Sequence, residues 1–472
     1  MRNLHAHDER KMAGFVRRKS PMAAWPARAL SIPVLLCLLT FAPAGSRAAE
    51  PVDWNALTPF GATRAGNESG SIPAWEGGLT SPPAGYAGPG SMHVDPFAND
   101  AVLYTVTAAN LSEHVDQLTP GLQAMLQRYP DSFRIPVYPS RRSHAAPQWV
   151  YDNTRRNAES ARLTEDGLGI EGAFGGIPFP QPSEALQVYW NHVTRWRGQY
   201  LTNRGHDANV YADGKFTLIT RSTQVKFHFY APGGSVEALG NRLFSLLSTV
   251  TAPARLARSG VLVHETLNQD ASPRQAWIYD SGRRRVLRAP LLAFDMSIGD
   301  ADALRTSDDT DMINGSPSRF EWKLLGRREM LIPYNNYRLE QGETETLLQP
   351  GHMDPARTRF ELHRVWVIEA NLKPEWRHVY ARRVFFVDED SWTVSIADQY
   401  DSNGKLWRAS LAFLKNYYEL PATLPAAFAF HDLASGRYHV QGLAVDGKEA
   451  MTLDPVPEDT AFTPAALSRF VR

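Results

Sequence analysis

The sequence predicts an α+β protein in which helices close a large curved antiparallel β-sheet, with a Pro/Gly-rich and helical N-terminal half in front of it. The spacing of apolar residues changes from a helical period to strict alternation after about residue 255. The alternating segments are joined by short turns, which favour antiparallel neighbours. Tryptophan and tyrosine also concentrate on these segments. Together these features predict a meander that curls into a half-barrel.

The first 48 residues read as an export signal and not as part of the fold. Arg28 precedes an apolar run over residues 32–41, and Ser46-Arg47-Ala48 offers small residues where a signal peptidase cuts. The run is shorter than the roughly 20 residues that a membrane-spanning helix needs. We therefore expect cleavage after Ala48 and a periplasmic protein. The sequence leaves Met1, Met12 and Met22 open as start residues.

Charge and cysteine content exclude several classes of function. The single cysteine, Cys37, lies inside the export signal, so the exported chain is expected to have no disulfide, thiolate metal site or cysteine nucleophile. After residues 1–48 there remain 42 basic and 48 acidic side chains, a net charge of about −6. A mildly acidic chain without a basic tract does not fit a nucleic-acid partner.

The exported chain divides into a segment 49–205 and an antiparallel half-barrel 206–472, which we expect to form one compact unit. The first of these begins with Gly- and Pro-rich loop from Pro59 to Pro96, which has no sustained period. Helical stripes of apolar residues are expected at residues 111–126, at 184–197 and from Ser235 to Leu247.

The second half carries the strands of the predicted sheet. Each of these segments is rich in β-branched and aromatic residues and ends at a short polar turn. The expected strands cover residues 261–267, 276–280, 320–326, 361–370 and 379–387.

Several acidic residues lie close together between Val387 and Ala409. Two interpretations compete for them, a metal or catalytic site and the turns of a β-sheet. Asn403-Gly404 predicts a two-residue type I′ hairpin, in which both residues take positive φ. The resulting register pairs Tyr400 with Trp407, Asp398 with Ala409, Ile396 with Leu411 and Val394 with Phe413, and Trp392 extends that apolar face. The opposite face, with Thr393, Ser395, Gln399, Arg408 and Ser410, is expected to be wetted by solvent.

The motifs in the sequence do not predict a metal site or a nucleotide site. A calcium loop aligned on Gly404 would put Gln399 first and Ser410 twelfth, which is the wrong chemistry. The "GLGIEG" of residues 167–172 lacks the following helix that a dinucleotide fingerprint needs. The sequence therefore predicts no catalytic residues, no metal and no cofactor. An envelope hydrolase with two carboxylates on separate strands stays open as an alternative.

Several long motifs resemble one bacterial family. "GSIPAWEGGL" (70–79), "GRREMLIPYNNYRL" (326–339) and "RHVYARRVFFVDEDSW" (377–392) are similar to the exported domain-of-unknown-function family 1329. The β half of that family resembles LolA and LolB, in which a curved sheet closed by helices covers an apolar cavity for acyl chains. The resemblance implies a LolA/LolB-like half-barrel and a hydrophobic ligand. LolA-like carriers are less than half as long, so it assigns no role to the first half.

Taken together, we expect a periplasmic carrier or chaperone that binds a lipid, acyl chain or other hydrophobic small molecule and serves envelope lipid or lipoprotein transport. The alternative is a non-catalytic accessory subunit that docks on an envelope transporter or an outer-membrane protein. Strand aromatics and their neighbours are the expected cavity lining. The expected lining residues are Trp277, Tyr279, Trp366, Trp392, Val394, Ile396, Asp398, Tyr400, Trp407, Leu411 and Phe413.

Overall fold

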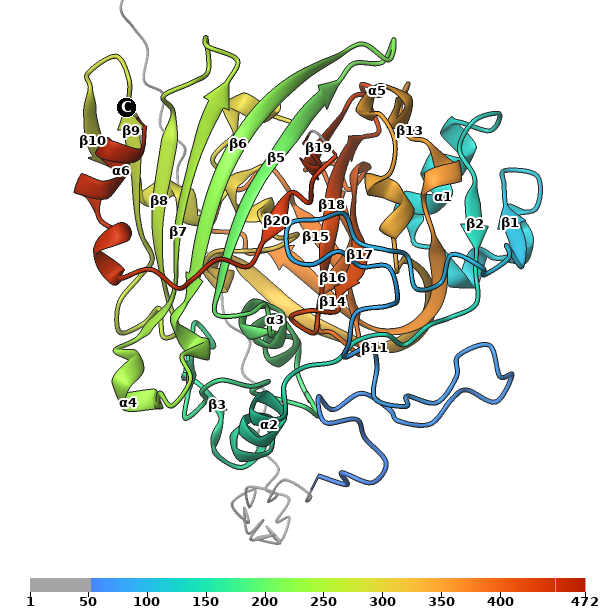
Figure 1. The fold of residues 1–472 in the computed structure, drawn as a ribbon, viewed down its shortest axis with the longest axis horizontal. Coiled ribbons are helices and arrows are strands. Elements are labelled where there is room, and N and C mark those ends of the chain that lie inside the picture. Colours follow the sequence, from blue (N-terminus) through green and yellow to red (C-terminus); the bar gives the residue numbers. More distant parts are fainter. Residues whose placement is uncertain (1–51, 446, 472) are drawn as a thin grey trace, which may run out of the picture. The chain divides into compact units, whose positions relative to one another are not determined.

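The computed structural model describes residues 52–445 and 447–471, so the predicted export signal lies outside the described residues. The described chain is built on one 16-stranded sheet (Figure 1). All its neighbouring strands pair antiparallel except for one parallel contact between β2 and β14. The sheet is open, since β1 and β10 form its two edges. The predicted fold class is confirmed. Between residues 52 and 471, position 446 apart, we find no helix with the length and apolar character to cross a bilayer.

The strands follow each other in space in the order β1-β2-β14-β15-β16-β17-β18-β19-β5-β6-β7-β8-β9-β10, with β11 paired to β14 and β20 to β5. Two short hairpins, β3–β4 and β12–β13, lie outside this sheet. The strand bounds are β1 Tyr104–Val106, β2 Ile135–Val137, β3 Arg162–Leu163, β4 Ile170–Glu171, β5 Tyr200–Val210, β6 Phe216–Phe227, β7 Arg242–Ala252, β8 Gly260–Thr266, β9 Gln275–Asp280, β10 Arg285–Arg288, β11 Phe320–Pro333, β12 Leu348–Gln349, β13 His352–Met353, β14 Phe360–Leu372, β15 Arg382–Asp388, β16 Val394–Tyr400, β17 Leu406–Tyr417, β18 Ala422–Asp432, β19 Tyr438–Leu443 and β20 Met451–Thr452.

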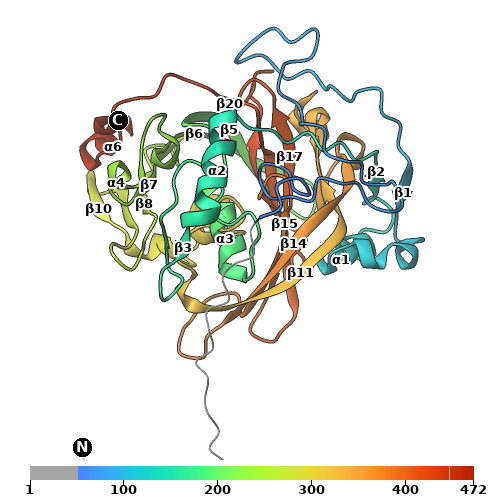
Figure 2. The ribbon, with the colours of Figure 1, turned by 90° about the horizontal axis from the view of Figure 1, so that it is seen from below.

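The helices of the described chain are short. The α-helices are α1 Pro120–Arg128, α2 Gln148–Ser160, α3 Ala185–Thr194, α4 Val236–Leu239, α5 Thr344–Leu347 and α6 Pro464–Phe470. The 3-10 helices are η1 Leu111–Glu113, η2 Val115–Gln117, η3 His228–Tyr230, η4 Pro290–Ala293, η5 Gly299–Ala301, η6 Ser307–Asp309, η7 Pro317–Arg319, η8 Tyr337–Glu340, η9 Pro355–Arg357 and η10 Asp459–Ala461. Figure 2 shows α2 and α3 next to each other, in front of the sheet.

The expected helix from Ser235 to Leu247 is wrong over most of its length. Ser235 caps α4, but this helix ends after one turn, at Gly240, whose φ is 55°. Of the leucines in the expected stripe, Leu239 lies in α4, whereas Leu243, Leu246 and Leu247 lie on β7, which pairs with β6 and β8 on either side. Pairing with two strands outweighs a weak helical preference, because helix propensity is only a small term.

The hairpin after β16 turns where the sequence predicts it, but with a different geometry. Gly404 has a φ of 75°, whereas Asn403 stays at negative φ, so the turn is not type I′. An irregularity in pairing next to Tyr400 places this residue opposite Leu406 and not opposite Trp407. The expected pairs of Asp398 with Ala409 and of Ile396 with Leu411 are confirmed.

The connection between β10 and β11 fills the space inside the curled sheet. We call residues 289–319 the connecting segment, and we call the sheet face that carries Arg221, Arg383 and Arg408 the inner face. In Figure 1 the segment is drawn in yellow, between the green strands β5–β7 and the orange to red strands β14–β18. It bonds to both groups of strands, through Asn209 on β5 and Arg408 on β17.

The connecting segment overturns the expectation that one face of β16 and β17 is wet. Thr393, Ser395, Gln399, Arg408 and Ser410 are all buried. Gln399 and Ser410 bond to each other across the strands, and Arg408 donates to the carbonyl of Ala303 in the segment at 2.7 Å. Alternation along a strand therefore marks a polar inner surface here, which the chain itself covers.

The residues before α1 wrap around the sheet from outside. Trp392, buried and at a φ of 58°, donates its indole N–H to the carbonyl of Phe60 at 2.9 Å. Phe60 in turn stacks on His144 and contacts Tyr151 edge-on. Its neighbour Gly61 lies so close to the backbone of Pro180 that a Cβ would meet the Pro180 oxygen at 2.1 Å. The predicted Pro/Gly-rich loop is thus an ordered strap.

Helix α6 covers the outer face of the sheet near its β10 edge (Figure 1). It closes a hydrophobic cluster that is separate from the main core, in which Phe462 and Leu467 pack against Leu247 on β7 and Leu262 on β8. Strand β9 is therefore covered on both faces, by α6 on the outside and by η4 of the connecting segment on the inside.

Gly121, at the start of α1, sits directly on the sheet, and this close approach gives a first prediction. A Cβ there would lie 2.2 Å from an oxygen of Asp398 and 2.8 Å from the Cβ of Ala409. We expect Gly121→Ala to lower the free energy of unfolding by about 1–3 kcal/mol, because α1 must move off the strands. Thermal and denaturant unfolding would measure it. Gly299→Ala, where a Cβ meets open space, is the matched control; equal stabilities of the two variants would contradict the prediction.

Candidate functional site

The inner face meets the connecting segment in a set of buried ion pairs. At one end, two arginines directly after α3 share one carboxylate. Arg195 holds both oxygens of Asp311, with nitrogen–oxygen distances of 2.5 and 2.8 Å, and Arg197 approaches the same carboxylate at 2.6 Å. The side chains of Arg195 and Arg197 are 1% and 9% exposed, and that of Asp311 is 18% exposed. The pairs therefore lie just beneath the surface.

Electrostatics at this end are unbalanced towards positive charge. Burial alone would raise the pKa of the Asp311 carboxyl, but attraction by Arg195 and then Arg197 holds it below its usual range. Burial first, and then repulsion by Arg195, lower the pKa of Arg197 to about 10. The same two causes lower the pKa of His192 to about 3, so the imidazole is neutral. Two guanidinium groups therefore share a single negative charge.

The middle of the connecting segment is held at the β5–β6 pair. Arg221 on β6 forms an ion pair with Asp207 on the neighbouring strand at 2.8 Å and a second one with Asp300 of the segment. Asn209 adds a bond to the Asp300 carbonyl at 2.9 Å. Burial would raise the pKa of Asp300, yet the attraction of Arg221 lowers it. Here the sheet supplies its own carboxylate beside that of the segment.

At the β15–β17 strands the segment inserts two adjacent acids. Arg383, almost fully buried, lies 3.0 Å from Asp308, which also accepts from His378 at 3.0 Å. Asp309 accepts from the Tyr380 hydroxyl at 2.8 Å, and Arg408 donates to the same hydroxyl at 2.7 Å. Burial would raise the pKa of Asp308, but attraction by Arg383 outweighs it and lowers the pKa. Acids of the segment therefore meet buried arginines at three separate places, through Asp300, Asp308 and Asp311.

The structure places the predicted lining residues in three different environments. One group, buried in the main hydrophobic core, comprises Trp392, Val394, Ile396, Tyr400, Leu411 and Phe413. Trp277 and Tyr279 pack half-buried against the cluster beneath α6. Trp366 and Trp407 lie under the guanidinium groups of Arg327 and Arg408. Their role toward a ligand stays a prediction. A surface hollow of about 430 Å³ lies elsewhere, lined by Tyr104, Glu113, His114, Asp116 and Gln117.

Asp398, the one acid among the predicted lining residues, anchors helix α1. Its carboxyl accepts from the backbone N–H of Gly121 at 2.9 Å, at the N-terminus of the helix. Arg382 attracts it without forming an ion pair. Burial raises the pKa of Asp398 to about 7, although the Gly121 bond acts in the opposite direction. The carboxyl is therefore a titrating structural contact between helix and sheet.

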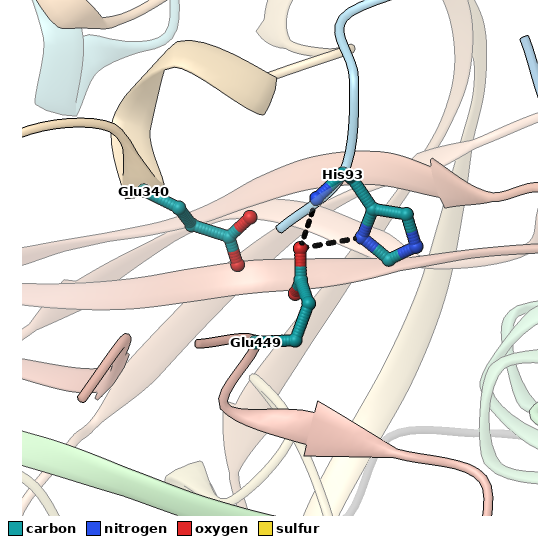
Figure 3. Close-up of side chains that lie close together, drawn as sticks. All are labelled: His93, Glu340 and Glu449. Atoms are coloured by element: carbon teal, nitrogen blue, oxygen red, sulfur yellow. Dashed lines mark hydrogen bonds and ion pairs between the residues drawn. The ribbon is translucent and has the colours of Figure 1, made fainter. Parts of the chain in front are cut away.

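A second buried assembly joins the N-terminal strap to the sheet (Figure 3). His93 of the strap lies between two acids, 2.6 Å from Glu449 and 2.9 Å from Glu419. Lys415 on β17 lies between Glu449, at 2.9 Å, and Glu340. Burial would lower the pKa of His93, but its bonds to Glu419 and Glu449 raise it.

His93, Glu340 and Glu449 have the spacing of metal ligands, with donor atoms within 4.8 Å of one another. The Lys415 ammonium bonds to both glutamates and already supplies a cation there. Burial raises the pKa of Glu340 to about 7 despite Lys415, whereas Lys415 and His93 overcome burial and lower that of Glu449 to about 2. The donor set fits an ammonium latch between strap and sheet better than a metal centre.

The second cluster with ligand spacing comprises His363, Asp388 and Asp390. Burial would lower the pKa of His363, but bonds to Asp388 and Glu361 raise it to about 9, so both ring nitrogens carry protons. Asp390 is held by Arg142 at 2.6 and 2.9 Å. An imidazolium has no lone pair for a metal, and the acids already have protein cations as partners.

Sequence reasoning missed the connecting segment and the arginines that it meets. The available signal was the length of the stretch between β10 and β11, since structureless connections of this length are uncommon in compact domains. Residues 289–319 contain six aspartates and two arginines. The partners of these acids are scattered over α3, β6, β15 and β17, so spacing along the chain could not identify them.

Comparisons with known proteins identify one family of unknown function and several relatives. The family described as "Protein of unknown function (DUF1329)" matches residues 105–468. "Uncharacterized protein PA3922" of Pseudomonas aeruginosa is 42% identical over 413 residues, which are 87% of this chain and 90% of that protein. A solved DUF1329 family protein from Desulfovibrio piger is 15% identical, with a TM-score of 0.40 over 59% of this chain and 95% of that one. The LolA superfamily protein NE2245 from Nitrosomonas europaea is 15% identical, with a TM-score of 0.35 over 60% and 98%.

Titration of Asp398 predicts a loss of stability with rising pH. The folded chain keeps this proton up to about pH 7, whereas the unfolded chain releases it near its ordinary pKa of 3.8. The folded state therefore binds more protons in this window, and the free energy of unfolding falls as the pH rises, by up to about 4 kcal/mol. Asp398→Asn should match the wild type at pH 4 and exceed it at pH 8 in chemical denaturation. The exposed Asp131→Asn is the control; equal pH profiles of wild type and Asp398→Asn would refute the assignment.

The buried ion pairs of Lys415 predict a large loss of folding stability when the ammonium is removed. Lys415→Met leaves Glu340 and Glu449 without their ammonium, and we expect a loss of about 3–5 kcal/mol in the free energy of unfolding. The triple variant with Glu340→Gln and Glu449→Gln should recover part of this loss. Exposed Lys405→Met serves as the control. A triple variant less stable than Lys415→Met would show that the acids are not the cause.

Proposed function

The chain belongs to the family DUF1329, and we propose that it is a non-catalytic carrier that shelters a lipid or other hydrophobic ligand inside the curled sheet during transport through the periplasm. The predicted export signal supports the location, and the resemblance to LolA-like half-barrels supports the ligand class. The connecting segment occupies the ligand space in the closed form. The function therefore requires that this segment exchange with the ligand.

The proposal depends on one observation: a segment with little regular secondary structure fills the space inside the sheet. The connecting segment contributes no strand to the sheet and no helix longer than four residues; an isolated bridge between Ser297 and Thr306 is its own β contact. It is attached to the sheet and to the end of α3 by ion pairs and single hydrogen bonds, and it also buries Leu292, Met312 and Ile313 in the main hydrophobic core. A filler of this kind can leave while the sheet keeps its strand ladder.

The wall behind the segment is apolar at one end. On β9, Ala276 and Ile278 belong to the main core, while Trp277 and Tyr279 belong to the cluster beneath α6. Residues of η4 contact this strand, and Leu292 is buried there. Departure of the segment would expose this inner wall to a ligand. We propose that it lines the ligand site, with the predicted aromatic residues of β9 supporting it from the outer face.

The energetics allow an exchange of this kind. Burial of about 14 methylene groups of an acyl chain contributes on the order of 10 kcal/mol before ordering costs are subtracted. Opening the segment costs the apolar contacts of η4 and separates several ion pairs. A carrier must also release its load, which requires that the closed and loaded forms differ by only a few kcal/mol.

Loosening the segment gives the test of the carrier function. Asp302 of the segment pairs with Arg437 in a partly exposed ion pair. We expect Asp302→Asn to raise the amount of lipid that co-purifies under native conditions several-fold over wild type, measured by mass spectrometry. The control is Asp116→Asn, an exposed acid outside the segment. Absence of lipid from the folded wild type and from folded Asp302→Asn would overturn the proposal.

A further inference from the structure

The arginines behind the connecting segment restrict which ligand can replace it. Buried cations cannot be left without partners, because the interior does not solvate them. Arg221 keeps Asp207 on its own sheet when the segment leaves, and Arg408 keeps Asp432, 3.9 Å away. Among the described residues, the carboxylates that pair with Arg383 are Asp308 and Asp309 of the segment, so this stretch must stay at Arg383 or be replaced by another anion. Arg195 and Arg197 pair with no carboxylate but that of Asp311 in the part of the chain described here. An occupant of the site must therefore bring negative charge to these two.

One carboxylate does not satisfy this pair. Both Arg195 and Arg197 have an Nε that is buried and without a hydrogen-bond partner among the described residues. One terminal nitrogen of Arg197 donates to the Val193 carbonyl. The guanidinium carbon of Arg197 lies over the ring of Phe227, 4.4 Å from the ring centre. Two guanidinium forks with spare donors match a group with three oxygens and two charges.

The surroundings also separate a polar end from an apolar end. Asp311 is 18% exposed, so the arginine end opens towards solvent. Helix η4 lies against the apolar wall of β9, and the chain on either side of Asp311 folds back to it, since the N–H groups of Asp308 and Ser316 donate to the carbonyls of Phe294 and Ala293. A ligand that follows the path of the segment would place its charged head at Arg195 and Arg197 and its apolar chain along β9.

Resting on the proposed function, we infer that Arg195 and Arg197 form the head-group site for a phosphate-bearing amphiphile, which takes the place of the Asp311 carboxylate when the connecting segment opens. The segment is then an internal substitute for the ligand, since it presents an acid to the same arginines. At Arg195 and Arg197 the exchange replaces one anionic partner by another, so these two arginines keep a counter-charge.

Lysophosphatidic acid and a monoacylglycerol of equal chain length test the head group, with inorganic phosphate as the probe without a chain. By titration calorimetry we expect the phosphate lipid to bind wild type at least tenfold more tightly than the neutral lipid. Arg197→Gln should weaken the phosphate lipid at least tenfold and leave the neutral lipid unchanged. Exposed Arg328→Gln is the matched control.

A second variant changes the other partner in the exchange. Asp311→Asn keeps both arginines and removes their internal partner, so it should bind the phosphate lipid more tightly than wild type does. Equal affinities for the two lipids, or an unchanged affinity in folded Arg197→Gln, would overturn the head-group site and leave the carrier function standing. If inorganic phosphate binds as tightly as the phosphate lipid, the acyl chain contributes nothing to binding and the ligand is not an amphiphile. If neither lipid binds wild type or Asp311→Asn, the proposed function itself falls.

Discussion

The pairing of buried charge across the inside of the sheet is the constraint on which the rest of the structure depends. Arginines project from α3, β6 and β15 into the space that the sheet encloses, and water does not reach most of them. Each must meet a carboxylate at close range, because an isolated buried cation costs several kcal/mol. The connecting segment supplies these carboxylates, and its irregular path follows from where the arginines stand. Regular secondary structure would not bring Asp300, Asp308 and Asp311 to three separate walls.

The same constraint explains why the strap and the sheet behave as one unit. His93 of the strap lies between Glu419 and Glu449, while Lys415 on β17 forms ion pairs with Glu449 and Glu340. The group is balanced only when strand, strap and the loop before β20 are all in place. Ionic groups of this kind add little net stability compared with apolar packing, but they penalise every arrangement in which a partner is missing. They therefore fix which segment lies where.

The sheet could be predicted from the sequence because paired strands show local sequence patterns. Alternation and turn residues identified β8, β9, β14 and β15, and the Asp398–Ala409 pair followed from one turn. The filling of the interior by the connecting segment shows no such local pattern in the sequence. Ser395 and Arg408 look like a wet face, since the pattern registers polarity and not what covers it. The helix expected after Ser235 failed for the complementary reason: leucines at helical spacing on β7 also satisfy a strand between two partners.

A shell filled by an ionic segment differs in one physical respect from a shell filled by an apolar core. Apolar packing is non-directional, and its loss exposes surface in proportion to area, so a core of that kind resists partial removal. An ion pair needs only an equivalent partner at the same place. Exchange at Arg195 and Arg197 can therefore proceed with the charges matched before and after, while the strand ladder of the sheet stays closed. The cost of opening then falls on the buried apolar side chains of the segment, Leu292 at the β9 wall and Met312 and Ile313 in the main core, and an acyl chain arriving at that wall restores the same kind of contact.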